Sequence, residues 1–240
     1  MLLQNKGFYK SFEFERYQYL GDPLNIIKIL NDKIVDELMI IDLDGAKSTG
    51  KYSFDWIHLE KVISESFSPV VFGGGILTID DADKAFTLGV EKIVLQRGLF
   101  NKKLVHHIVT TYGAQSLIAS IDVCEQDDGY HVYDQVHKKP QLDMTVDQML
   151  KFAHSAGVGE ILVTNICRDG QFLGLDQKMV QYLAYRSDVP LIIAGGLNSK
   201  NCFTEAIRNG ADAVAGAGIF TLLGPYNAVL VSYPGTLDGA

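Results

Sequence analysis

The chain lacks paired cysteines, long apolar runs and clusters of positive charge, and each absence excludes a class of protein. Its three cysteines are far apart and have no CxxC spacing (Cys124, Cys167 and Cys202), so we expect reduced thiols in a cytoplasmic protein. No run of about 18 apolar residues is present, so we expect no membrane span, and the first residues lack the pattern of a signal peptide. The net charge of −8 argues against nucleic acid as a partner.

The spacings typical of a metal site are also missing. The six histidines are scattered along the chain, so we expect no metal and no cofactor. Cys167 has no adjacent histidine that could activate it as a nucleophile, and we expect a buried thiol at that position.

An apolar stretch that runs into three glycines, at residues 68–76, organises the rest of the chain. A similar apolar stretch that ends in glycines recurs 121 residues later, at residues 189–197. A strand that ends in glycines leaves backbone N–H groups without a covering side chain. The repeated stretch therefore indicates a duplicated fold with two anion sites.

Short strands alternate with helical patterns along the chain, which is typical of a parallel sheet with helical crossovers. The expected strands lie at 2–4, 36–42, 68–76, 92–95, 116–122, 160–164, 189–197 and 212–215. The expected helices lie at 23–31, 54–66, 80–88, 101–112, 145–156, 176–186 and 199–209. Gly89 and Gly210 are 121 residues apart, and Glu37 and Glu160 are 123 apart, so the two halves match.

Two matching halves of four β/α units close most naturally into a (β/α)₈ TIM barrel, and 240 residues suit one. We expect a single domain over 1–240, with half-barrels at about 1–114 and 115–223 and a tail at 224–240. A doubly wound open sheet is the alternative. The first strand is truncated, the eighth helix is short or absent, and residues 227–234 are expected to be extended or irregular.

In such a barrel, functional residues belong at the carboxyl ends of the strands. Asp122 ends a strand there and is either a general acid or base or a turn carboxylate. Asp169, before Gly170, either closes a loop or orients substrate hydroxyls. Arg97 either grips a carboxylate or phosphate, blocks the anion site, or lies on the surface.

Charged residues begin three strands at the opposite end of the barrel: Glu37, Lys92 and Glu160. If they point inward they form a charged ring, and a buried ring needs pairing between its charges.

Five motifs together resemble the cyclase subunit of imidazole glycerol phosphate synthase, the HisF type. They lie at residues 71–76, 36–38, 159–164, 168–170 and 210–213, and the resemblance runs from Leu2 to about Phe220. The sister isomerase of histidine biosynthesis shares the half-barrel repeat but matches less well at 168–170 and 159–161.

The resemblance implies a barrel that receives ammonia from a HisH-type glutaminase on its N-terminal face. Ammonia crosses the barrel and attacks a bisphosphorylated ribonucleotide at the mouth, which gives imidazole glycerol phosphate and an aminoimidazole carboxamide ribotide. The implied phosphate ligands are Gly75, Gln96 and Arg97 at one end and Asp169, Gly170, Gly195, Gly196, Ala217 and Gly218 at the other. Glu37, Lys92 and Glu160 match the family's ammonia gate, and Asp122 matches one of its two catalytic aspartates.

The sequence departs from the family pattern in three places. Leu2 stands where the second catalytic aspartate belongs, 120 residues before Asp122. Gln96 and Arg97 replace small polar residues at the first phosphate site, and the truncated first strand removes the arginine of the gate. A leucine cannot move a proton, so a cyclase that needs both carboxylates should be slow by orders of magnitude.

Residues 19–23 and 230–234 resemble HisF-like paralogues linked to bacterial surface polysaccharide and lipopolysaccharide synthesis. In those systems a barrel and a glutaminase are thought to deliver ammonia to a separate sugar amidotransferase. We therefore expect an ammonia conduit, which leaves open whether this chain is itself an enzyme. The alternatives are an active cyclase of histidine biosynthesis and a non-catalytic scaffold that activates the glutaminase.

Overall fold

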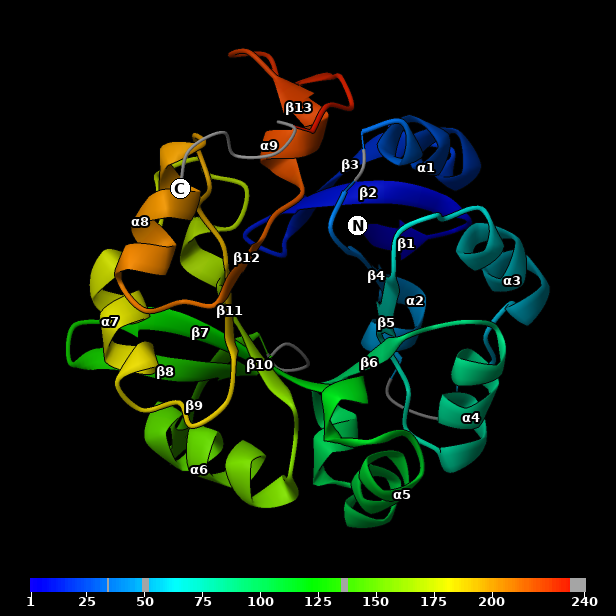
Figure 1. Cartoon of the computed structure of the whole chain (residues 1–240). Helices are drawn as coiled ribbons and strands as arrows, with labels where there is room; N and C mark the ends of the chain where they lie inside the picture. The colour runs from blue at the N-terminus through cyan, green and yellow to red at the C-terminus, as the bar shows by residue number, and fades with distance from the viewer. Residues whose placement is uncertain (34, 49–51, 135–137, 234–240) are drawn as a thin grey trace.

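The computed structural model describes residues 1–33, 35–48, 52–134 and 138–233. Eight parallel strands follow one another in space in chain order. They are β1 (Leu2–Gln4), β4 (Leu38–Asp42), β5 (Val70–Gly73), β6 (Lys92–Leu95), β7 (Leu117–Gln126), β10 (Glu160–Asn165), β11 (Leu191–Ala194) and β12 (Ala213–Ala215). Helices surround this ring of strands (Figure 1), and the expected TIM-barrel class is confirmed.

Seven helices of eight residues or more cover the strands in the described part of the chain. They are α1 (Pro23–Asn31), α3 (Trp56–Ser64), α4 (Ile79–Thr87), α5 (Lys102–Tyr112), α6 (Val146–Ala156), α7 (Gln177–Ala184) and α8 (Asn201–Arg208). None of these described helices could cross a membrane. Two are shorter, α2 (Leu43–Lys47) and α9 (Gly218–Thr221), so the expected lack of a full eighth helix is confirmed.

Polar residues directly before the helices explain where most of them begin. A side-chain oxygen accepts a hydrogen bond from a backbone N–H of the first turn, which would otherwise have no partner. The capping residues are Asp22, Asp55, Thr78, Asn101, Thr145 and Asp176. Thr145 and Gln148 cap each other reciprocally at the start of α6.

The ring of strands has a seam next to its first strand. β1 has only three residues and pairs with β4 in parallel. Its other edge pairs antiparallel with β2 (Gly7–Phe12), which continues into β3 (Arg16–Gly21). In the described residues no ladder joins β1 to β12, as expected for a truncated first strand.

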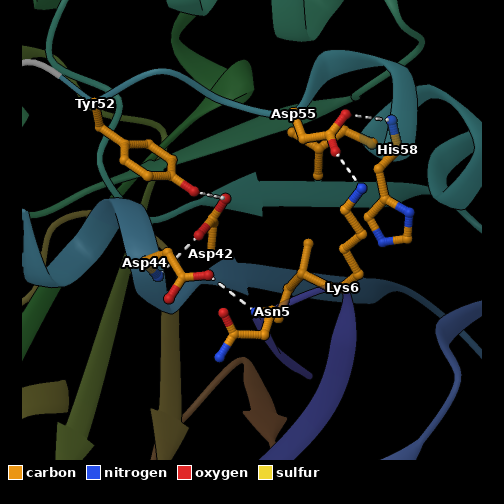
Figure 2. Close-up of a pocket in the computed structure, with 9 residues that line it drawn as sticks. Asn5, Lys6, Asp42, Asp44, Tyr52, Asp55 and His58 are labelled. Atoms are coloured by element: carbon orange, nitrogen blue, oxygen red, sulfur yellow. Dashed lines mark hydrogen bonds and ion pairs between the residues drawn. The ribbon is translucent and has the colours of Figure 1, made fainter.

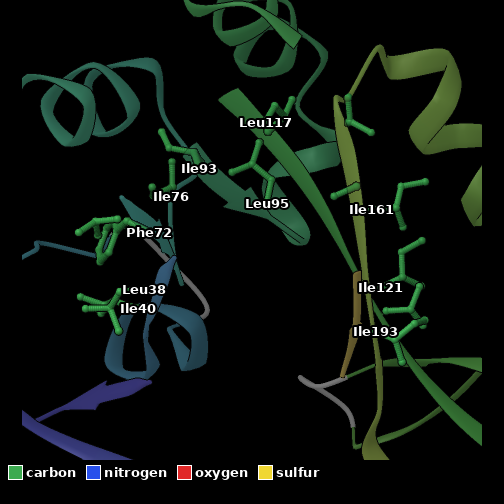
Figure 3. Close-up of a cluster of buried hydrophobic side chains, with 14 of the residues drawn as sticks. Leu38, Ile40, Phe72, Ile76, Ile93, Leu95, Leu117, Ile121, Ile161 and Ile193 are labelled. Atoms are coloured by element: carbon green, nitrogen blue, oxygen red, sulfur yellow. The ribbon is translucent and has the colours of Figure 1, made fainter. Parts of the chain in front are cut away.

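The buried apolar side chains form two separate clusters because successive strand residues point to opposite faces. The larger cluster fills the space between strands and helices and includes Leu38, Phe72 and Ile161 (Figure 3). The smaller one contains strand residues alone and therefore lies inside the ring. Its members are Val71, Val94, Ile118, Leu162 and Ile192.

The second half carries its own antiparallel extension at the rim. β7 continues past its parallel partners and pairs with β8 (Gly129–Asp134), which pairs with β9 (Lys139–Thr145). β7 is therefore longer than the expected strand at 116–122, because its end belongs to a hairpin and not to the barrel.

A hairpin formed by β13 (Leu222–Leu223) and β14 (Ala228–Val229) follows α9 and lies between α8 and α1 (Figure 1). The Gln18 amide donates to the Asn227 carbonyl at 2.9 Å, which ties this hairpin to β3. Tyr233 donates its hydroxyl to the Asp36 carboxylate. Residues 230–233 belong to no helix or strand, which agrees with the extended or irregular segment expected at 227–234, and Pro234 lies outside the described residues.

Substituting Gly74 by alanine should destabilise the fold strongly. Its φ is +94°, and an added Cβ would lie 2.2 Å from the Asp42 carbonyl oxygen. We expect a loss of about 3 kcal/mol or more in the free energy of unfolding, measured by urea denaturation. Gly224→Ala is the control: its φ is +72° with open space around it, so about 1 kcal/mol is expected. Equal losses would mean that the close backbone contact is unimportant.

Candidate functional site

All eight parallel strands end at the same rim, which we call the mouth. Asp122 lies there on β7 and is 6% exposed. It shares the inner face of its strand with Ile118. The Gln96 side-chain amide, which follows β6, donates to the Asp122 carboxylate at 2.6 Å. The carboxylate is therefore held toward the end of β6.

The strand register places Leu2 and Asp122 at equivalent positions in the two halves. Leu2 lies opposite Ile41 in the β1–β4 ladder, and Asp122 lies opposite Thr164 in the β7–β10 ladder. Ile41 and Thr164 are 123 residues apart, the spacing that relates β4 to β10. The mouth therefore has a carboxylate in one half and an apolar side chain at the matching place in the other.

A buried lysine that the sequence reasoning missed lies on the other side of the mouth. The Lys10 ammonium is 2.6 Å from an Asp169 carboxylate oxygen, and the Ser11 hydroxyl donates to the other oxygen at 2.5 Å. Burial lowers the pKa of Lys10, and Asp169 opposes this effect. The signal available in the sequence was a lysine inside the alternating segment at residues 8–14.

The glycines at the strand ends allow backbones to approach closely. A Cβ on Gly195 would lie 2.3 Å from the Asn165 carbonyl oxygen, and one on Gly196 would lie 2.3 Å from that of Gly174. Gly170 packs in the same way on the Ser11 carbonyl, at 2.6 Å from its would-be Cβ. These glycines are therefore covered by the chain's own backbone.

Two further residues predicted at the second anion site, Ala217 and Gly218, lie at the start of α9. Ala217 makes no side-chain cap bond there. A Cβ added to Gly218 would lie 2.9 Å from the Phe172 ring and 3.4 Å from the Lys10 side chain. The structure thus brings Gly218 and Asp169 together around Lys10.

Arg97 lies at the opposite side of the mouth, against the carboxyl end of α2. Its guanidinium donates to the Ser48 carbonyl at 2.6 Å, to that of Ala46 at 3.1 Å and to that of Gly45 at 3.3 Å. Gly75 is also there: its would-be Cβ lies 2.6 Å from the Gly45 backbone. The residues predicted for the first anion site are therefore together, but their partners are protein groups.

The three charged residues at the opposite rim form one bridged cluster. The Lys92 ammonium is 2.9 Å from a Glu37 oxygen and 2.8 Å from a Glu160 oxygen. Burial lowers the pKa of Lys92 and the two carboxylates raise it, with a net rise. Lys92, on β6, therefore stays charged while it joins β10 and the residue that precedes β4.

A cavity of about 200 Å³ lies beside the end of β4 (Figure 2). Asp42 shares a strand face with Leu38 and Ile40, which pack toward the helices, so the cavity lies outside the ring of strands. Its lining residues are Leu3, Asn5, Lys6, Asp42, Asp44, Tyr52, Asp55, His58 and Leu59. The sequence reasoning did not single out this cavity.

Asp42 is the buried acid of this cavity. It accepts hydrogen bonds from the N–H groups of Asp44 at 2.9 Å and Gly45 at 3.0 Å, and so caps α2. Burial raises the pKa of Asp42 to about 6, and the two backbone bonds oppose this shift only in part. The Tyr52 hydroxyl lies 3.5 Å from its second oxygen.

The expectation of a buried thiol at Cys167 was wrong: this residue is exposed, whereas Cys124 and Cys202 are buried. Cys167 lies in the short 3₁₀ helix that follows β10, at the rim and not within the strand. Its exposure follows from that place.

Replacing Asp42 by asparagine should change how stability depends on pH. Between about pH 4 and 6 the folded chain keeps a proton on Asp42 that the unfolded chain has lost, because its pKa rises from 3.8 to about 6. The wild type should therefore lose roughly 2 to 3 kcal/mol relative to Asp42→Asn as the pH rises from 4 to 7, measured by urea denaturation. Asparagine also caps helices well and stands at the matching place in the second half, Asn165. A constant difference between the two proteins would contradict the raised pKa.

Comparison with known proteins agrees with this architecture. Residues 5–223 match the family described as Histidine biosynthesis protein. The putative imidazole glycerol phosphate synthase subunit hisF2 of Pseudomonas aeruginosa is 34% identical over 98% of this chain and 93% of its own. The putative subunit hisF3 of Vibrio vulnificus is 32% identical over 98% and 90%, and the HisF subunit of Exiguobacterium sibiricum is 31% identical over 88% and 84%. The chain therefore belongs to the histidine biosynthesis protein family and is a HisF-type paralogue within it.

Proposed function

We propose that this chain works in the cytoplasm with a HisH-type glutaminase and conducts the released ammonia to an acceptor at its mouth. The glutaminase docks on the rim that carries Glu37, Lys92 and Glu160. Ammonia passes this cluster, crosses the ring of strands and leaves between Asp122 and Asp169. The acceptor is a phosphorylated small molecule, a sugar, which a separate amidotransferase amidates for a surface polysaccharide.

The observation that carries this proposal is the apolar interior between two charged rims. The side chains inside the ring are Val71, Val94, Ile118, Leu162 and Ile192. An ammonium ion would lose its hydration there at a large cost in free energy, whereas neutral ammonia would lose little. Such an interior supports passage of ammonia and excludes free exchange of ions with the mouth.

The acids of the mouth support a conduit over a cyclase. Leu2 offers no proton donor or acceptor at the place that matches Asp122. The remaining carboxylate at Asp122 already accepts a hydrogen bond from Gln96 at 2.6 Å. Each positioned general acid or base raises the rate of a reaction by a factor of about 10² to 10⁴. Of the two carboxylates that the cyclase reaction would use, the one at position 2 is missing here.

A working cyclase is the second candidate, because one observation favours it. The mouth keeps Asp122, and it keeps a buried Lys10–Asp169 pair at 2.6 Å that could position a substrate. In that case the chain would itself be a lyase and make imidazole glycerol phosphate.

Two rates measured side by side separate these functions. On mixing with a HisH-type glutaminase, we expect glutamine hydrolysis to rise at least about 10-fold. With the bisphosphorylated ribonucleotide and an ammonium salt, we expect turnover at least about 10²-fold below that of the HisF subunit of Exiguobacterium sibiricum, since one carboxylate is absent. Turnover equal to that subunit would refute the conduit. Unchanged glutamine hydrolysis would refute the glutaminase partner, and stimulation without ammonia transfer to a sugar acceptor would leave only a scaffold.

Restoring the missing acid gives a second prediction. Leu2→Asp should raise cyclase turnover about 10-fold or more if the carboxylate is the main defect. Leu2→Asn is the matched control, because it has nearly the same shape but cannot exchange a proton. Equal turnover of the two variants would show that the mouth lacks more than this acid.

A further inference from the structure

The cavity beside the end of β4 contains a buried carboxylate oxygen that lacks a close donor. Asp42 is 5% exposed, and its first oxygen accepts the two N–H bonds that cap α2. Among the described residues, its second oxygen has a single hydrogen-bond partner, the Tyr52 hydroxyl at 3.5 Å, which is at the limit of a hydrogen bond. A buried carboxylate oxygen without a good donor costs free energy, so this oxygen is open to a donor from a ligand.

A second polar atom of the cavity lining has no partner in the part of the chain that the structure describes. This atom is Nε2 of His58, which is buried. Asp55 caps the helix α3 and accepts the backbone N–H of His58, not its ring. Burial lowers the pKa of His58, and the nearby Asp55 carboxylate opposes this effect, so the ring is neutral at pH 7. A neutral ring nitrogen either donates or accepts a hydrogen bond, depending on the tautomer.

These two atoms belong to opposite sides of the cavity. Figure 2 shows Asp42 beside Tyr52 on one side and His58 beside Asp55 on the other. Buried apolar side chains also line the space: Leu3 and Leu59. The cavity therefore offers a carboxylate oxygen at one side, an imidazole nitrogen at the other, and apolar surface for carbon atoms.

The charges around the cavity favour a cationic ligand. Its described lining has three carboxylates and one ammonium group: Asp42, Asp44, Asp55 and Lys6. The Lys6 ammonium is paired with Asp55 at 2.8 Å, so the charge that remains is negative, and such a lining attracts cations. Lys47 also interacts with Asp44, but its ammonium lies over the Tyr17 ring at 4.0 Å, outside the lining.

Size and position define the kind of ligand further. The cavity volume of about 200 Å³ is below the roughly 300–1,000 Å³ of sites for drug-sized molecules, so the ligand has few non-hydrogen atoms. Asp42 lies on the outer face of β4 with Leu38 and Ile40, whereas Asp122 shares the inner face of β7 with Ile118. The cavity is therefore separate from the mouth, and its ligand is not the acceptor of the conduit.

We propose that this cavity binds a small amino alcohol, with its ammonium group on the Asp42 carboxylate and its hydroxyl group on Nε2 of His58. An ammonium group gives the open carboxylate oxygen a charge-assisted hydrogen bond. A hydroxyl group both donates and accepts, so it pairs with either tautomer of the ring. The carbon atoms between the two groups contact Leu3 and Leu59 and lose water there. Anions are excluded because they would meet the carboxylates of Asp42 and Asp44.

Ethanolamine is the probe, and an NMR titration of the wild-type chain at pH 7.5 tests the proposal without any variant. We expect a dissociation constant of about 1 mM, with shifts at Tyr52, His58 and Leu59. Propylamine has a methyl group in place of the hydroxyl and should bind about 3- to 10-fold more weakly. Ethylene glycol has a hydroxyl in place of the ammonium and should bind at least about 10-fold more weakly. Equal binding of ethanolamine and ethylene glycol, or no shift at these residues, would overturn the proposal.

The variant Asp42→Asn tests the ammonium contact, because asparagine still caps α2 but carries no charge. At pH 7.5 we expect it to bind ethanolamine about 10-fold more weakly than the wild type. At pH 5 the two proteins should agree within about 2-fold, because Asp42 has a pKa of about 6 and is largely protonated there. The other titratable groups that face the cavity are the same in both proteins: Asp44, Tyr52, Asp55, His58 and Lys6. A loss of the same size at both pH values would overturn the ammonium contact.

A buried cap in the second half of the barrel provides the matched control. Asp176 caps α7 and is 7% exposed, and it does not line the cavity. Asp176→Asn removes the same charge and keeps the cap, so ethanolamine should bind within about 2-fold of the wild type. A loss as large as that of Asp42→Asn would mean that the charge acts from a distance and not by contact, and would overturn the proposal.

The variant His58→Phe tests the hydroxyl contact. It keeps an aromatic ring at this place on α3 but removes the Nε2 atom. We expect ethanolamine and propylamine to bind this variant with equal affinity, because the hydroxyl has lost its partner. A preference for ethanolamine as large as that of the wild type would overturn the assignment of His58.

Discussion

The mouth of this barrel depends on one contact that occurs in each half: a glycine that ends a strand packs on the backbone that ends the strand before it. A Cβ on Gly74 would lie 2.2 Å from the Asp42 carbonyl oxygen, and one on Gly195 would lie 2.3 Å from that of Asn165. Both glycines have a positive φ, +94° and +95°, which other residues adopt only with strain. The contact therefore fixes the path of the segments that follow β4 and β10, and with it the side chains that can reach the centre of the rim.

The same scaffold carries different chemistry in its two halves. At the strand end, Asp42 caps α2 with two hydrogen bonds, whereas the matching Asn165 has no partner for either side-chain atom in the described residues. On the inner face, Leu2 occupies in the first half the position that Asp122 occupies in the second. Equivalent residues in the two halves can therefore differ in function while the fold stays the same, because the glycine contacts and the apolar clusters determine the backbone geometry in both halves.

Local signals explain how much of the fold could be predicted from the sequence. The starts of the helices expected at 23–31, 101–112 and 145–156 were predicted to within one residue, because capping is an interaction between neighbours in the chain. The mouth was predicted less well. Lys10 and Asp169 are 159 residues apart. A local pattern can indicate that residues 8–14 are extended, but not that this segment lies beside the residues that follow β10. The sequence left three roles open for Arg97: binding an anion, blocking the anion site, or lying on the surface. It could not decide among them because the position of the α2 carbonyls depends on the packing of Gly45 against Gly75.

The two rims differ in how their charges are held. At the rim where the strands begin, the Lys92 ammonium lies between the Glu37 and Glu160 carboxylates, which raise its pKa, so the charges of this rim are paired with one another. At the mouth, the Asp122 carboxylate accepts a hydrogen bond from the neutral Gln96 amide, and Leu2 adds no second acid. In the conduit proposed above, the apolar interior between these rims would favour neutral ammonia over ammonium, because ammonium would be a buried ion there. Such a conduit would release a neutral nucleophile beside a single carboxylate, which is why the proposal gives the amidation itself to a separate amidotransferase.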